Sequence, residues 1–308
     1  MITDDKNYKL SVELDKIRLR NPTMLASGIL GISQNIFERL YNENIGAVVT
    51  KSISVNPMKG YPNPTVVPLG AGSYLNAVGL SNPGVDAFSK ELSNNKIIPI
   101  FISLVGSSEK DFSKMVKTFD SLNILGYEIN LSCPHVSKMG MEVGDDPEAV
   151  NKIVKTVRMN TNKPISVKVG VGSIDVVELA RVAVDAGADI ITAINTLRAM
   201  SIDIETMMPI LSNRIGGLSG NAIKPIGIRC VYEISKKLEV PVMGCGGVSS
   251  WKDVVEYMIA GASAVQVGSV LGSRGPRIFN QITKGLKNYV ENKDLKNISE
   301  IIGIAHKY

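Results

Sequence analysis

Cysteine is scarce in this sequence, and its spacing argues against several kinds of site. The chain has 308 residues and three cysteines, Cys133, Cys230 and Cys245, with no CxxC pair. An odd number without that spacing argues against a disulfide framework and against a metal or iron–sulfur site within the chain. Structural disulfides are rare in reducing compartments, so we predict a cytoplasmic protein.

Long hydrophobic runs are also absent. No window approaches 18 uninterrupted apolar residues, which argues against a transmembrane span. The charged N-terminus lacks the apolar region of a signal peptide. The net charge of +5 is spread evenly, without the basic stripe that is typical of nucleic-acid binding. We therefore predict no membrane contact and no nucleic-acid ligand.

Apolar residues are plentiful, and they alternate between short runs and amphipathic stretches. The chain is 44% hydrophobic and 20% charged, as expected for a globular protein with a large core. The expected strands are Thr23–Ala26, Ala47–Thr50, Ile98–Leu104, Tyr127–Asn130, Ile165–Val169, Ile190–Ala193, Val242–Gly244 and Ala264–Val267. The expected helices include Asn35–Asn42, Val85–Asn94, Glu109–Leu122, Pro147–Met159, Asp175–Ala186, Ala222–Leu238 and Trp251–Ala260.

This alternation predicts an α/β fold with a parallel sheet that is buried on both faces. Eight strand–helix units favour a (β/α)8 TIM barrel, as a single domain over residues 1–308. A doubly wound sheet is the alternative, but no GxGxxG motif follows the first strand. Residues 8–20 alternate like a hairpin that would close the bottom of the barrel. Insertions after strand 2 (52–83), strand 4 and strand 6 (196–221) are expected to form lids.

A thiol follows the fourth expected strand. In Tyr127–Val136 the strand ends at Asn130 and breaks at a Cys-Pro pair that begins with Cys133. Barrel enzymes keep their catalytic groups on the loops at the carboxyl ends of the strands. Cys133 is therefore a candidate base or nucleophile. By contrast, Cys230 is interpreted as core and Cys245 as a small residue tolerated between glycines.

Glycine turns follow strands 7 and 8, at Gly246–Gly247 and Gly268–Ser269. Backbone N–H groups in such turns can approach an anion closely, and barrels often bind phosphate at these two positions. Taken singly, each would be an ordinary tight turn. Together they predict a phosphate-bearing ligand, to which Gly216–Gly220 could donate further hydrogen bonds.

A lysine, Lys168, lies inside the fifth strand between two valines. Lysine is rarely buried there without a partner, so a structural ion pair is one interpretation. The other places the ammonium beside an electron-rich heterocycle, where positive charge stabilises a reduced, anionic form. Lys51, after strand 2, would then lie across the same site.

A series of strings at strand ends and in the insertions carries a resemblance along almost the whole chain. The strings are Thr50–Ser52, Asn76–Gly84, Asn130–Pro134, Val167–Gly170, Ala193–Thr196, Gly216–Gly220 with Ala222–Pro225, Gly246–Val248 and Val267–Ser269. In this order they resemble the family-1 dihydroorotate dehydrogenases, and the catalytic subunit of type B in particular.

The resemblance implies FMN as the cofactor and dihydroorotate as the substrate. The residues implied to hold FMN are Ala26, Ser27, Gly28, Lys51, Ser52, Asn130, Lys168, Ile194, Gly220, Gly246, Gly247, Gly268 and Ser269. Those implied to hold the substrate are Lys51, Asn76, Val78, Gly79, Leu80, Asn130, Asn195 and Thr196. Cys133 is implied to remove the C5 proton while hydride passes from C6 to flavin N5. The similar membrane-bound type has a serine there.

The electron acceptor is implied by the run Ala193–Glu205, which resembles the form that works with an electron-transfer subunit. That form would be a heterotetramer around a homodimer core, in which the partner carries FAD and a [2Fe–2S] cluster and passes electrons to NAD. A fumarate-linked homodimer without this partner is the alternative.

His135 departs from the family pattern, which commonly has an asparagine at this position. Cys-Pro-His occurs in the similar dihydropyrimidine dehydrogenases, so reduction of uracil or thymine is the alternative activity. The stretches Asn76–Gly84 and Leu197–Glu205 match the dihydroorotate enzymes better. A barrel that only binds a phosphate ligand is a further alternative, and it predicts no flavin.

Overall fold

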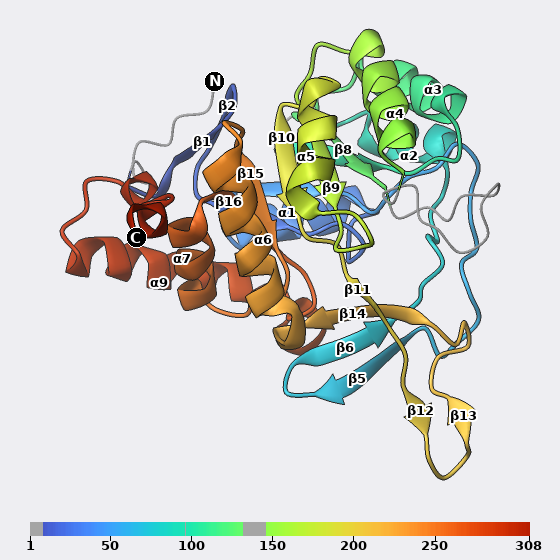
Figure 1. Ribbon diagram of the computed structural model, residues 1–308. Helices are drawn as coiled ribbons and strands as arrows, with labels where there is room; N and C mark the ends of the chain where they lie inside the picture. Colours follow the sequence, from blue (N-terminus) through green and yellow to red (C-terminus); the bar gives the residue numbers. More distant parts are fainter. Residues whose placement is uncertain (1–8, 96, 132–145) are drawn as a thin grey trace.

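The computed structural model describes residues 9–95, 97–131 and 146–308, and a closed parallel barrel lies at its centre (Figure 1). Around the barrel the strands follow the order β10-β15-β16-β3-β4-β7-β8-β9. They are β3 (Thr23–Leu25), β4 (Ala47–Val49), β7 (Ile100–Leu104), β8 (Gly126–Asn130), β9 (Ile165–Val169), β10 (Ile190–Ala193), β15 (Val242–Cys245) and β16 (Ala262–Val267). The predicted TIM barrel is confirmed, because each expected strand forms one strand of the closed barrel.

Helices cover the outside of the barrel. They are α1 (Gln34–Asn42), α2 (Val85–Leu92), α3 (Glu109–Phe119), α4 (Pro147–Asn160), α5 (Val176–Asp185), α6 (Lys224–Lys237), α7 (Trp251–Ala260), α8 (Leu271–Arg274) and α9 (Ile278–Asn292), with 3-10 turns η3 (Asn221–Ile223), η4 (Ile298–Ile301) and η5 (Ile304–Lys307). In α4, Val150, Ile153, Val154 and Val157 are buried, which is the spacing of one helix face. The helix expected from Ala222 begins instead as η3. None of the described helices has the length and apolar character needed to cross a membrane.

Two short strands precede the barrel, β1 (Val12–Leu14) and β2 (Ile17–Leu19), and they pair antiparallel. Their alternate side chains are buried. Because β1 also packs against β16, this pair closes one end of the barrel, as the alternating pattern predicts. Figure 1 places it at the end opposite the lid strands described next.

The insertions after β4 and β10 join in one second sheet, here called the lid sheet. It contains β5 (Val66–Gly70), β6 (Ser73–Asn76), β11 (Leu197–Ala199) and β14 (Gly216–Gly220), in the order β11-β14-β6-β5. A further ribbon of β12 (Ile202–Asp203) and β13 (Met208–Pro209) projects beyond it (Figure 1). The lid sheet has its own apolar cluster of Leu75, Ala77 and Leu211. The lid expected after strand 4 lies at residues 132–145, outside the described residues.

Candidate active site

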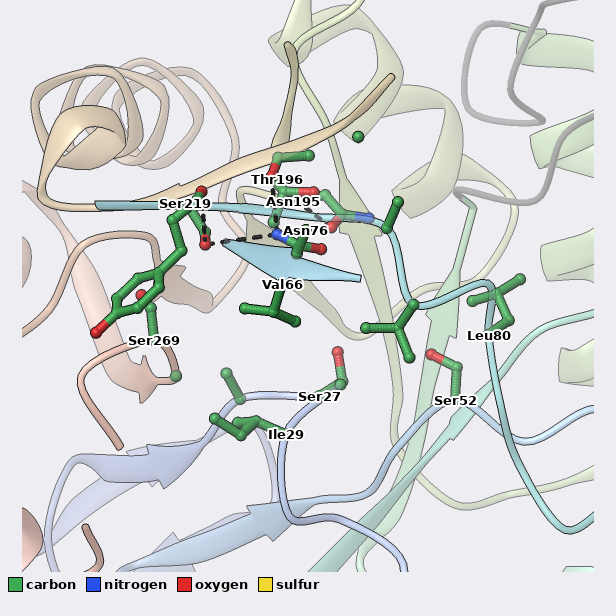
Figure 2. A pocket seen from close by; sticks show the side chains of 18 of the residues that line it. Ser27, Ile29, Ser52, Val66, Asn76, Leu80, Asn195, Thr196, Ser219 and Ser269 are labelled. Carbon is green, nitrogen blue, oxygen red and sulfur yellow. Dashed lines mark hydrogen bonds between the residues drawn. The ribbon is translucent and has the colours of Figure 1, made fainter. Parts of the chain in front are cut away.

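A cavity of about 900 Å³ lies between the carboxyl ends of the barrel strands and the lid sheet (Figure 2). Its wall includes every predicted cofactor and substrate residue in the described part of the chain. These are Ala26, Ser27, Gly28, Lys51, Ser52, Asn76, Val78, Gly79, Leu80, Asn130, Lys168, Ile194, Asn195, Thr196, Gly220, Gly246, Gly247, Gly268 and Ser269. Cys133 and His135 lie outside the described residues. A volume of this size is at the upper end for small-molecule sites and suits a large ligand or two stacked ones.

The charge of the cavity wall has one sign. Lys51, Lys59, Lys168 and Arg198 line it, and among the described residues no aspartate or glutamate does. A wall that carries only positive charge favours an anionic ligand. Phosphates and carboxylates both fit this requirement.

Lys168 is the most deeply placed of these cations, with 5% of its surface exposed. Its Nζ donates to Ser27 Oγ at 3.2 Å and to Gln266 Oε1 at 3.1 Å, and it lies 3.8 Å from Glu128 Oε1. Burial lowers the pKa of the Lys168 ammonium, but Cys245 and Glu128 raise it, and the net effect is a raised pKa. Lys168 therefore stays charged at the cavity wall.

Lys51 differs from Lys168 in this respect. Burial lowers the pKa of its ammonium, because less water is available to solvate the charge. An anionic ligand beside Lys51 would restore that stabilisation.

Two residues near Lys168 have roles that the sequence analysis did not assign. Cys245, interpreted as a small residue tolerated between glycines, lines the cavity and raises the pKa of the Lys168 ammonium. Glu128 was not singled out, although it is a charged residue inside an apolar strand, the same signal that identified Lys168. Its partners, Lys168, Thr192 and Gln266, come from the barrel strands β9, β10 and β16.

Amide side chains, among them Asn76 and Asn195, line the cavity (Figure 2). Asn130 Nδ2 donates to Ser52 Oγ at 2.9 Å, and Asn195 Nδ2 donates to Asn130 Oδ1 at 3.3 Å. Asn76 Nδ2 donates to the Gly217 carbonyl at 2.8 Å, which ties two strands of the lid sheet together at the site. Three amides held by neighbours give a ligand both donors and acceptors in fixed directions.

The loop that follows Asn76 is held in an unusual conformation. Leu80 has a φ of +56°, which is rare for a bulky side chain. Asn82 fixes the turn, because its Nδ2 donates to the Leu80 carbonyl at 2.8 Å while its Oδ1 accepts from Gly84 N–H at 2.9 Å. Asn82 is 6% exposed, so a buried side chain of the loop itself holds its backbone in this conformation.

The glycine turns after β15 and β16 leave room for an anion. Gly246 and Gly247 have φ values of +126° and +69°. A Cβ on Gly247 would lie 2.7 Å from the Gly220 carbonyl oxygen and 2.7 Å from Lys224 Cβ. Within the described part of the chain, the N–H groups of Gly247 and Ser269 donate to no protein acceptor. Such N–H groups are suited to phosphate oxygens.

Comparison with known proteins gives one consistent result. The family model described as dihydroorotate dehydrogenase matches residues 9–290. The chain is 42% identical to the Pyrococcus furiosus protein "Dihydroorotate dehydrogenase B (NAD(+)), catalytic subunit" over 97% of this chain and 99% of the relative. It is 46% identical to the protein of the same name from Archaeoglobus fulgidus, over 96% and 99%. The protein of that name from Geotalea uraniireducens is 41% identical, over 96% and 97%.

Proposed function

Because the chain belongs to the dihydroorotate dehydrogenase family, we propose that it oxidises dihydroorotate to orotate in pyrimidine biosynthesis, as the catalytic subunit of an NAD-linked enzyme. The observation that carries this proposal is the cavity, which collects the predicted residues and whose charged side chains, among the described residues, are all cationic. Near-full-length matches to relatives named for this reaction support it.

The family is flavin-dependent, and FMN is the flavin that we propose for this chain. The N–H groups of Gly247 and Ser269 would bind its phosphate, and Ala26, Ser27 and Gly28 would face its ring. Lys168 would present a positive charge to that ring. When bound, FMN supplies the acceptor for the hydride that leaves the substrate.

Dihydroorotate would occupy the amide-lined side of the cavity. Asn76, Asn130 and Asn195 would hydrogen-bond its ring, and the Lys51 ammonium would bind its carboxylate. Cys133 would take the C5 proton as a thiolate. An ordinary thiol has a pKa of about 8.5, so a usable thiolate fraction exists slightly above neutral pH.

Electrons would leave through a second subunit. The relatives are named catalytic subunits, and three cysteines in the whole sequence are fewer than the four that hold an all-cysteine iron–sulfur cluster. The FAD and [2Fe–2S] centres would therefore belong to the partner, in a heterotetramer built on a homodimer of this chain. The cytoplasmic location remains a prediction from the sequence.

Turnover of the FMN-loaded chain with an artificial dye tests the substrate assignment. We expect the dye to be reduced with dihydroorotate and not with dihydrouracil, and fumarate to be a poor replacement for the dye. Preference for dihydrouracil would overturn the assignment in favour of the pyrimidine reductase. Efficient use of fumarate would favour the form without a partner.

Gly247→Ala tests the phosphate site. The added Cβ would crowd Gly220 and Lys224 and would strain a residue with positive φ, at a cost on the order of 1–3 kcal/mol. We expect FMN affinity to fall about tenfold or more, measured by fluorescence titration. Gly275→Ala is the matched control, because Gly275 also has a positive φ, +63°, but an added Cβ meets nothing within 4 Å. Equal losses in the two variants would contradict the phosphate assignment.

A further inference from the structure

A buried carboxylate lies beneath the cavity. Glu128, in the middle of β8, is 0% exposed and does not itself line the cavity wall. Its Oε2 accepts hydrogen bonds from Gln266 Nε2 at 2.5 Å and Thr192 Oγ1 at 3.1 Å. Its Oε1 accepts none in the described part of the chain and lies 3.8 Å from Lys168 Nζ. One oxygen is thus anchored, while the other faces the ammonium.

Among the described residues, Glu128 is the carboxylate that forms an ion pair with Lys168. Two titratable groups act on that ammonium, Glu128 from β8 and Cys245 from β15, and the cation Lys51 lines the same cavity from the end of β4. Burial raises the pKa of the Cys245 thiol above its ordinary value, so the thiol is uncharged near neutral pH. The remaining hydrogen-bond partners, Ser27 and Gln266, are neutral.

Gln266 connects the two charged groups. Its Nε2 donates to Glu128, and its Oε1 accepts from Lys168 at 3.1 Å. Because the carboxylate takes the amide nitrogen, the amide oxygen is turned toward the lysine. Glu128, which balances the charge of Lys168, therefore also fixes the direction of the ammonium through Gln266.

We propose that Glu128 is a positioning residue that keeps Lys168 protonated and, through Gln266, holds the ammonium at the cavity wall. The inference rests on the proposed function, since the ring that would meet this ammonium is that of FMN. Without the carboxylate, the burial that lowers the pKa of Lys168 would be opposed only by Cys245, whose own buried thiol has a raised pKa, and the charge of Lys168 would be lost progressively as the pH rises. The charge that Lys168 presents to the flavin would then depend on pH in the variant, whereas in the native protein the raised pKa of Lys168 keeps that charge in place near neutral pH.

Glu128→Gln in the FMN-loaded full chain tests the proposal through the reduction potential of the flavin between pH 6 and pH 9. We expect the potential of the variant to fall below that of the native protein, with a gap that widens as the pH rises. A change of about tenfold in the reduction equilibrium, or about 30 mV for a two-electron couple, is the expected scale at pH 9. Thr192→Val, which removes a neutral donor to the same carboxylate, should give a gap that does not vary with pH.

The stability of the flavin-free chain gives a second readout. In Glu128→Gln, the folded-state pKa of Lys168 would drop below the unfolded value of about 10.4. The unfolded chain then binds more protons between these two values, so the unfolding free energy rises with pH there. In the native protein the folded pKa is the higher one, and no such rise should occur below pH 10.

The outcomes separate this inference from the proposed function. A native chain that binds no FMN would defeat the proposed function, while the stability profile would still test Glu128. FMN binding with parallel pH profiles for Glu128→Gln and the native protein would overturn the inference alone. If Glu128→Gln does not fold, Glu128→Asp, which withdraws the charge from Lys168, should show the same pH-dependent gap on a smaller scale, and a constant gap would overturn the inference.

Discussion

Cys133→Ser is expected to lower kcat about 100- to 10,000-fold near neutral pH while FMN remains bound. A serine hydroxyl is far less acidic than a thiol, so little of the basic form exists at pH 7 to accept the C5 proton. Turnover of the native protein should rise with pH and level off once the thiol is ionised. The variant should show no plateau over the pH range in which the thiol of the native protein ionises. Steady-state assays across pH, with flavin absorbance as the measure of bound FMN, check both points.

The matched control for Cys133→Ser is Cys230→Ser. Cys230 lies in α6, is 0% exposed, and burial raises the pKa of its thiol to about 11, so it has no part in the proposed chemistry. Its replacement should cost stability and leave kcat close to native. A native kcat in Cys133→Ser would remove Cys133 from the role of base.

Lys168→Met is expected to destabilise the chain by about 3–5 kcal/mol, because it leaves the buried Glu128 carboxylate without its counter-ion. FMN affinity should fall as well, since the cavity wall loses its most deeply placed positive charge. Urea unfolding of the flavin-free protein and FMN titration measure the two losses separately.

The double variant Glu128→Gln with Lys168→Met separates stability from binding. Removal of both charges should restore much of the stability, because a neutral pair of similar volume is often tolerated where an ion pair was buried. It should not restore FMN affinity. If Lys168→Met alone is as stable as the native protein, the ion pair does not stabilise this fold.

The barrel was predictable because its strands are buried on both faces and therefore read as continuous apolar runs. Ile165–Val169 and Ile190–Ala193 have the predicted bounds. The lid sheet was not predictable in the same way. Strand β5 is mostly exposed, and β6 pairs with β14, a segment more than a hundred residues further along the chain. Local periodicity contains no signal for such a pairing.

The cavity residues were largely predictable because carboxyl ends of parallel strands meet at one face of a barrel. Glu128 was missed because it lies inside β8 rather than at its end, where only its charge within an apolar strand marked it. Its role depends on how the strands are arranged around the closed barrel. That arrangement brings Gln266 of β16 and Lys168 of β9 to it, and only the closed barrel reveals it.

Anaerobic mixing of the FMN-loaded chain with dihydroorotate is the most direct test of the proposed function. We propose that one cavity holds both the flavin and the dihydropyrimidine, so that hydride passes between them without help from another subunit. We predict that the visible flavin absorbance bleaches in a single turnover, with one orotate formed for each FMN. An FMN-loaded chain whose absorbance stays unchanged with dihydroorotate would rule out this function.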